Sequence, residues 1–149
     1  MSIIKKKIKL KLINHLLKSG NKTTCESILI KSFKDIQKSS LKSHKKVVKI
    51  AIINSSSTFR IVKLKEKKRK KKKSVKEIPT FILSYFERIS WSLKVILTYS
   101  KKQSENNFYK KLKQEIIINS KHEGNAIDTK VDQHKQVFAK KRLLLYFKW

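Results

Sequence analysis

The sequence predicts a mainly α-helical protein, a single domain of six helices with a protruding two-stranded β-hairpin arm between the third and fourth helices. In six segments, apolar residues recur three and four positions apart, which is the spacing of amphipathic helices. Residues 58–81 instead combine β-branched residues, cations and a proline, a pattern typical of two short strands. At this length one domain is expected, so we predict one unit over residues 1–149, with residues 1–10 as a basic N-terminal extension.

The first predicted helix covers residues 3–18, where apolar side chains follow one face and lysines fill much of the rest. The alternation of apolar and basic residues over 8–12 also fits a strand, which leaves the start of this helix open. Gly20 follows the last turn, at the position where a left-handed residue commonly ends a helix. The apolar face consists of Ile4, Ile8, Leu12, Ile13, Leu16 and Leu17.

A second helix is predicted to begin at a cap formed by Thr23 or Thr24, because Glu26 stands at the capping-box distance from Thr23. Cys25 falls on the inner face and is expected to pack as a small core residue. The third helix covers about residues 45–54 and leads into the arm. The remaining inward-facing residues are Ile28, Leu29, Ser32, Phe33 and Ile36, then Val47, Val48, Ala51 and Ile52.

The arm has seven consecutive cations at its tip, between a strand over residues 58–65 and a strand over residues 75–81. Pro79 cannot donate a ladder hydrogen bond, so the second strand must lie at a sheet edge. Adjacent cations repel one another and cannot be buried, so they require a polyanionic partner. A solvated loop or a targeting signal is the alternative interpretation. The tip consists of Lys67, Lys68, Arg69, Lys70, Lys71, Lys72 and Lys73.

Three helices are predicted after the arm. One begins after Pro79, the next spans about residues 104–120, and the last covers about residues 129–147. Their predicted inner faces are Ile82, Phe86, Ile89, Leu93, Ile96 and Leu97, then Phe108, Leu112, Glu115, Ile116 and Ile117, and finally Val131, His134, Val137, Phe138, Leu144, Leu145, Tyr146 and Trp149.

The chain carries 39 Lys and Arg against 10 Asp and Glu, a net charge of +29. Small soluble domains usually have a net charge of about 2–8, so self-repulsion should leave the free protein marginally stable or partly disordered until a partner neutralises it. Nucleic-acid binding is the function that this charge favours. Two alternatives are a first helix that lies on an anionic membrane and a free architectural protein that binds DNA and RNA alike.

An enzyme is the class that the sequence supports least. The four histidines, His15, His44, His122 and His134, show no metal-ligand spacing. Two glycines cannot build a phosphate-binding loop, and a lone cysteine cannot form a disulfide. We therefore predict no catalytic residue, no metal site, no cofactor and no small-molecule substrate.

The composition also bears on the origin of the chain. Only four of the 39 cations are arginine, while Lys, Ile and Asn, which have A/T-rich codons, are abundant. This bias is typical of an AT-rich organelle genome. The chain has no apolar run long enough to span a membrane, and its start has neither a secretory nor an Arg-rich transit pattern. We expect an organelle-encoded protein, or one whose presequence has been removed.

Several short motifs, in order along residues 11–149, resemble the small-subunit ribosomal protein seven family of bacteria and organelles. The turn Gly20-Asn21-Lys22 and its flanking helices are similar to the family's Gly-Lys-Lys turn, and residues 46–54 resemble its helix before the arm. Further similarities lie in Glu77-Ile78-Pro79, Glu123-Gly124-Asn125-Ala126-Ile127, Val131-Asp132-Gln133-His134-Lys135 and Tyr146-Phe147-Lys148-Trp149.

The resemblance implies six helices with a β-ribbon arm, and a protein that binds the 3′ major domain of small-subunit rRNA and helps to assemble the head. It also implies an arm that reaches the exit tRNA site near the mRNA path, contacts with neighbouring head proteins, and an organellar ribosome, mitochondrial in the first place and plastid in the second. Two departures stand out. The lysine run and Ser74 replace the family's Gly-based arm tip, and Lys5–Lys11 stand where bacterial members have a longer basic tail.

The predicted RNA contacts are basic residues of the first and last helices, the turn after the first helix, the arm and the fourth helix. We expect the first and last helices and the arm to line one concave face. The side chains of Phe59 and Tyr85 could stack on bases or pack in the core. The contacts are Lys5, Lys7, Lys9, Lys11, Lys22, Arg60, Lys63, Lys65, Lys67, Lys68, Arg69, Lys70, Lys71, Lys72, Lys73, Arg88, Lys94, Lys130, Lys141, Arg142 and Lys148.

Overall fold

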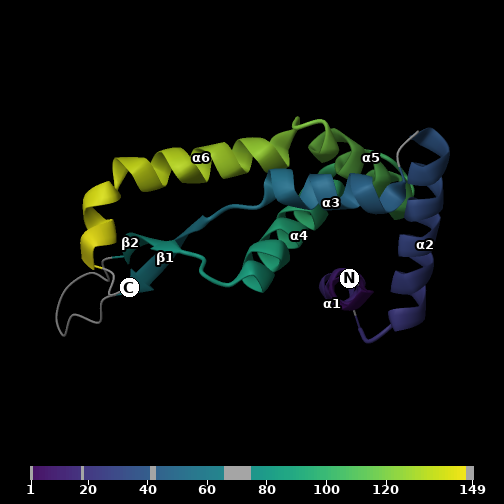
Figure 1. Cartoon of the computed structure of the whole chain (residues 1–149), viewed down its shortest axis with the longest axis horizontal. Helices are drawn as coiled ribbons and strands as arrows, with labels where there is room; N and C mark the ends of the chain where they lie inside the picture. The colour runs from purple at the N-terminus through teal and green to yellow at the C-terminus, as the bar shows by residue number, and fades with distance from the viewer. Residues whose placement is uncertain (1, 18, 41–42, 66–74, 147–149) are drawn as a thin grey trace.

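The computed structural model describes residues 2–17, 19–40, 43–65 and 75–146. Within them three α-helices precede a two-stranded antiparallel hairpin and three α-helices follow it, which confirms the predicted fold class (Figure 1). The elements are α1 (Ser2–Leu16), α2 (Lys22–Ser39), α3 (His44–Ser55), β1 (Phe59–Lys65), β2 (Val75–Phe81), α4 (Tyr85–Lys102), α5 (Phe108–Ser120), α6 (Asn125–Ala139) and the 3-10 helix η1 (Lys141–Tyr146).

The hydrophobic core lies between α2, α3, α4 and α5, and α1 covers one side of it. Leu29, Ile36, Leu93 and Leu112 are almost completely excluded from solvent, as their helical spacing predicts. Cys25 is also buried, which confirms the prediction that it packs as a core residue. In the described part of the chain, no helix is long and apolar enough to cross a membrane.

The start of α2 differs from the prediction. Gly20 has a φ of +75°, so the left-handed residue after α1 is confirmed. The helix nevertheless begins at Lys22, and its N-cap is Asn21 rather than Thr23 or Thr24. The Thr24 hydroxyl lies inside the first turn and donates to the Asn21 carbonyl at 2.9 Å, so the predicted threonine cap is wrong.

The helices after the arm also begin or end at residues other than those predicted. Ile82 is buried in the segment before α4 rather than in the helix, and α5 begins four residues later than predicted. The helix α6 starts early because Gly124, with a φ of +95°, turns its carbonyl to accept the amide of Ile127 at 2.9 Å. It ends at Ala139, and the chain continues as the tighter η1 instead of an α-helix to residue 147.

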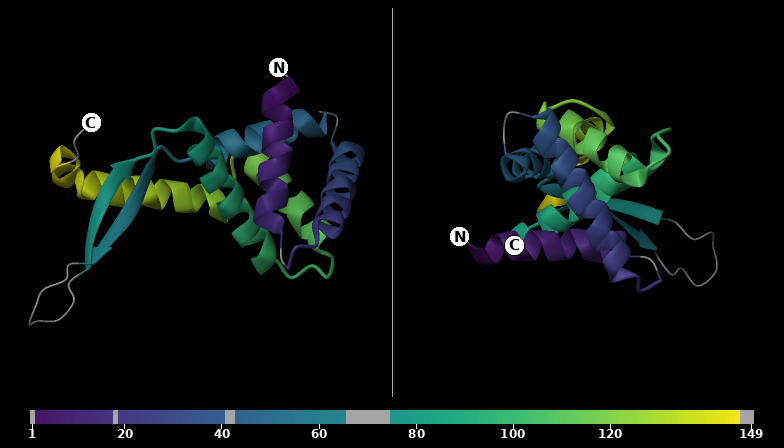
Figure 2. Two further views of the ribbon diagram at one scale, coloured as in Figure 1. Left: turned by 90° about the horizontal axis from the view of Figure 1, so that it is seen from below. Right: turned by 90° about the vertical axis from the view of Figure 1, so that its right-hand side faces the viewer.

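The arm projects from one end of the elongated molecule, and α1 and α2 lie towards the other end (Figure 1). Seen from below, α1, α4 and the arm lie on the near side, with α6 behind them (Figure 2, left). The end of α6 and η1 return to the root of the arm, where η1 contacts β2 and α6 contacts β1. The arm is therefore supported by the last helices of the chain, as well as by the segments that lead into it.

Candidate nucleic-acid interface

The strands of the arm pair in a fixed register that places Ile61 opposite Pro79 and Lys63 opposite Glu77. In the described residues the sheet has two strands, so each strand has a free edge. Pro79 fits in such an edge strand, because it has no N–H group that would have to be paired. This confirms the prediction that the second strand lies at a sheet edge. The pairing brings cations of both strands onto one narrow ribbon.

An aromatic cluster fixes the root of the arm on α6. The ring centroid of Phe59 lies 4.6 Å from that of Phe81 on the paired strand. It also lies 5.3 Å from the imidazole of His134 and 6.3 Å from the ring of Phe138, both on α6 and both edge-on. His134 reaches Ser57 at 3.2 Å as well. Of the two roles considered for Phe59, the structure shows packing rather than an open stacking surface.

One carboxylate joins the arm to the segment after α6. Glu77 binds Lys140 through Oε2 at 2.6 Å and Lys63 through Oε1 at 3.3 Å. These hydrogen bonds, first from Lys140 and then from Lys63, lower the pKa of Glu77 below its ordinary value. Sequence reasoning missed Lys140, because an ion pair between residues 63 positions apart leaves no local pattern.

A second group of cations lies where α1 crosses α4. The ammonium of Lys11 donates to the Phe86 carbonyl at 2.6 Å, and His15 Nε2 lies 2.8 Å from the Ser90 hydroxyl. Burial lowers the pKa of His15, and the nearby charges of Lys94 and Lys11 lower it further. His15 is therefore a neutral contact between the two helices at physiological pH.

Two predicted contacts already serve the fold. Arg88 donates through Nε to the carbonyl of Ile82 at 2.7 Å, which holds the entry to α4. Lys130 donates to the carbonyl of Asn54 at 2.8 Å, and burial lowers the pKa of its ammonium. Both side chains are half-buried, and their roles in RNA binding stay predictions.

The structure thus arranges the predicted contacts in two main groups. The arm group contains the exposed side chains of Arg60, Lys63, Lys141 and Arg142, and the helix group contains that of Lys94 with the half-buried Lys11 and Arg88. Lys9 is exposed on another face of α1. Lys22 is exposed at the start of α2, apart from the arm. The side chains of Lys5, Lys7 and Lys65 and all of Lys67–Lys73 and Lys148 lie outside the described residues.

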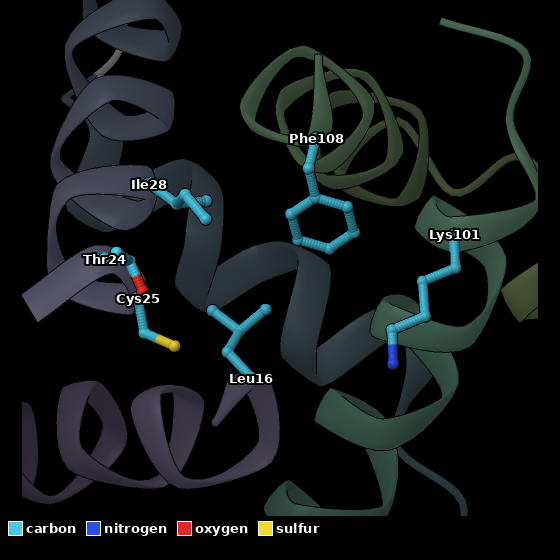
Figure 3. Close-up of a pocket in the computed structure, with 6 residues that line it drawn as sticks. All are labelled: Leu16, Thr24, Cys25, Ile28, Lys101 and Phe108. Atoms are coloured by element: carbon cyan, nitrogen blue, oxygen red, sulfur yellow. The ribbon is translucent and has the colours of Figure 1, made fainter. Parts of the chain in front are cut away.

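A pocket of about 300 Å³ opens where α1, α2, α4 and α5 meet (Figure 3). Its walls are mainly apolar and include Leu16, Ile28 and Phe108, with the Cys25 side chain on one side and Lys101 on another. Among the residues that the structure describes, no three His, Cys, Asp or Glu side chains gather into a metal-binding group.

The fold and charge together define a class of small basic proteins in which a helical body supports a cationic β-hairpin, an arrangement suited to a polyanion. The family model described as ribosomal protein S7p/S5e matches residues 1–141, and the chain belongs to this family.

Three relatives illustrate the similarity. A small ribosomal subunit protein uS7 of Karelsulcia muelleri is 29% identical over 87% of this chain and 79% of its own length. The small ribosomal subunit protein uS7m of Reclinomonas americana is 27% identical, with 94% and 84% of the two chains covered. The protein uS7c of Bigelowiella natans is 28% identical, with 91% and 82% covered.

Proposed function

We propose that the protein is a structural component of the small ribosomal subunit, in which it binds the 3′ major domain of the rRNA and assists assembly of the head. Membership of the ribosomal protein S7p/S5e family supports the ribosomal role. The relatives described above, each called a small ribosomal subunit protein, support the same subunit. The proposed role is structural and includes no catalytic step.

The observation that carries the RNA-binding role is the excess of cations at the root of the arm. In the described residues of β1, β2 and η1, Glu77 is the sole acidic residue, and it already binds Lys63 and Lys140. Arg60, Lys141 and Arg142 add three further exposed cations. Folded RNA supplies the missing negative charge, and each neutralised phosphate releases counterions into solution.

The arm group and the helix group of cations suggest how the protein would bind RNA. Each group of cations binds the backbone of a separate RNA segment, so the protein clamps segments that would otherwise repel one another. The proposal further includes an arm that reaches the exit tRNA and the mRNA, and contacts of the body with neighbouring head proteins. We further propose an organellar ribosome, mitochondrial before plastid, on the basis of the Lys- and Ile-rich composition.

The proposal is tested by binding the full chain to a transcript of the 3′ major domain across a salt series. A 5′-domain transcript and duplex DNA of equal length serve as competitors. Preferential binding of the 3′ major domain, and sedimentation with small subunits after a moderate salt wash, are the expected results. Equal binding to DNA, or sedimentation apart from any ribosomal particle, would overturn the proposal in favour of an architectural protein.

The contribution of the arm group is measured with charge-matched variants. Replacing Lys141 and Arg142 by glutamine removes two exposed cations beside the arm, and should reduce the slope of log K against log salt by about 1.4–1.8. The control replaces Lys31 and Lys34, two exposed lysines of α2, by glutamine. A loss of slope in the control as large as in the arm variant would show that the arm group has no special role.

A further inference from the structure

A groove of about 330 Å³ lies between α1 and the first turn of α4, and it is lined by Leu10, Lys11, Asn14 and Phe86. Two of these residues are large apolar side chains at the surface, since Leu10 is 52% exposed and Phe86 is 39% exposed. The adjoining Leu83 and Tyr85 are also exposed, at 81% and 56%. Such a cluster of exposed apolar side chains on a strongly basic protein suits a partner that offers both apolar surface and negative charge.

The polar groups around the groove narrow the choice of partner. Lys11 Nζ lies 5.4 Å from the centroid of the Phe86 ring. The α1 sequence contains no acidic residue, and Glu87 is the single acid of α4. Asn14 offers both a hydrogen-bond donor and an acceptor. The groove therefore combines apolar walls, one amide and one cation, Lys11, that has no acidic partner among the described residues of α1.

We propose that this groove binds one unpaired RNA nucleotide, whose base packs between Leu10 and Phe86 and whose phosphate is neutralised by Lys11. Unpaired bases are recognised by packing on apolar and aromatic side chains and by hydrogen bonds to their edges, which Asn14 supplies. A volume of about 330 Å³ is at the small end of ligand sites and suits a single base. This inference rests on the proposed rRNA-binding function and adds a specific base contact to its phosphate contacts.

The groove is also held in shape before any ligand arrives. The Lys11 ammonium bridges α1 to the Phe86 carbonyl, and the contact between His15 and Ser90 lies one turn further along both helices. Leu12 and Ile13, which flank the groove residues in α1, are buried in the core. A base would therefore enter a site whose walls need little rearrangement, which reduces the entropic cost of binding.

The test measures binding of the full chain to the 3′ major domain transcript after two substitutions. Leu10→Ser removes an apolar wall, and should weaken binding by about 5- to 100-fold with an unchanged salt slope, because no phosphate contact is lost. Asn14→Ala should weaken binding by about 2- to 10-fold. Ile30→Ser, at a 47% exposed position of α2, is the matched control and should bind normally.

Chemical probing of the transcript identifies the nucleotide. One unpaired base should be protected by the wild-type chain and become reactive again with Leu10→Ser, while the other protections remain. If wild-type binding to the 3′ major domain is intact but neither variant changes affinity or base reactivity, the groove inference is wrong and the proposed function stands. If the variants bind naked RNA normally but fail to join particles that contain other head proteins, the groove is a protein-docking site and the inference is also overturned. Failure of the wild-type chain to bind the transcript refutes the proposed function itself.

Discussion

Glu77 Oε2 lies 2.6 Å from Lys140 Nζ, and this ion pair connects the second strand of the arm to the residue that follows α6. The same carboxylate binds Lys63 on the first strand at 3.3 Å. A single acidic side chain therefore joins both strands of the arm to the C-terminal helix. It does so four residues along the strands from the Phe59–Phe81 pair, next to the cations proposed to bind RNA.

The first prediction concerns the titration of Glu77. Its pKa lies below the ordinary value of 4.5, first because of Lys140 and then because of Lys63. The ion pairs are therefore complete above that value and are lost as the pH falls through the lowered pKa. Lys140→Met should raise the pKa of Glu77 towards 4.5 in a carbon NMR titration of the carboxyl group. Lys141→Met, which removes the next cation, is the control, and an equal rise in both variants would contradict the assigned contact.

The second prediction concerns the aromatic cluster. Phe59→Ala removes the ring that contacts Phe81, His134 and Phe138 together, and should lower the free energy of unfolding by about 1–2 kcal/mol. The loss is below the figure for a fully buried phenylalanine because Phe59 is half-buried. Phe138→Ala, at a 63% exposed position, should cost less. Urea unfolding of both variants measures the difference, and the reverse order would show that the cluster does not hold the arm.

The third prediction follows from the two partly buried histidines. Burial and neighbouring lysines lower the pKa of both His15 and His134 below 6.5, so the folded state takes up protons less readily than the unfolded state. Stability should therefore be full above about pH 6.5 and decrease as the pH falls through the lowered values. Thermal unfolding at a series of pH values tests this. His15→Gln should reduce the acid-induced loss of melting temperature, and an unchanged loss in this variant would contradict the prediction.

The fourth prediction compares the cost of alanine at two glycines that have a left-handed backbone conformation. A Cβ atom on Gly124 would lie 2.6 Å from Ile118 Cγ2, whereas one on Gly20 would meet nothing within 4 Å. Both residues have positive φ, so alanine strains the backbone at either position. Gly124→Ala adds a steric clash at the start of α6, and should destabilise by roughly 1–3 kcal/mol more than Gly20→Ala. Equal destabilisation in denaturant unfolding would show that Ile118 moves aside without cost.

The fifth prediction concerns salt. Self-repulsion from a net charge of +29 opposes folding, and added ions screen it. The melting temperature of the free protein should rise from about 0.05 M to about 0.5 M salt, while RNA affinity falls over the same range. Differential scanning fluorimetry and filter binding measure the two trends. A melting temperature that decreases with salt would mean that favourable ion pairs outweigh the repulsion.

The sequence alone predicted those features that depend on local pattern. The spacing of Leu29 and Ile36, and of Leu93 and Leu97, identified inward faces that the structure confirms. Pro79 identified an edge strand, because a residue without an N–H group can pair only where no ladder hydrogen bond is needed from it. Glu115, predicted to face inward, is buried and accepts hydrogen bonds from Gln103 and Asn119.

Features that depend on distant residues could not be predicted in this way. The ion pair of Glu77 with Lys140 and the groove between Leu10 and Phe86 each form where two elements far apart in sequence happen to pack. The N-cap of α2 was also misassigned, because three residues within one turn, Asn21, Thr23 and Thr24, carry side chains suited to capping. Local sequence patterns indicate which residues could form such contacts or caps, but the tertiary packing determines which of them do.

The support of the arm by α6 has a consequence for the order of events during synthesis. The strands are encoded in the middle of the chain, yet His134, Phe138 and Lys140, which hold their root, are made some sixty residues later. While the ribosome is still synthesising α5, the hairpin lacks its aromatic contacts with α6 and the ion pair with Lys140. The arm therefore reaches its final orientation only when translation of the chain is nearly complete, and a partner that requires that orientation meets it after the helical body has formed.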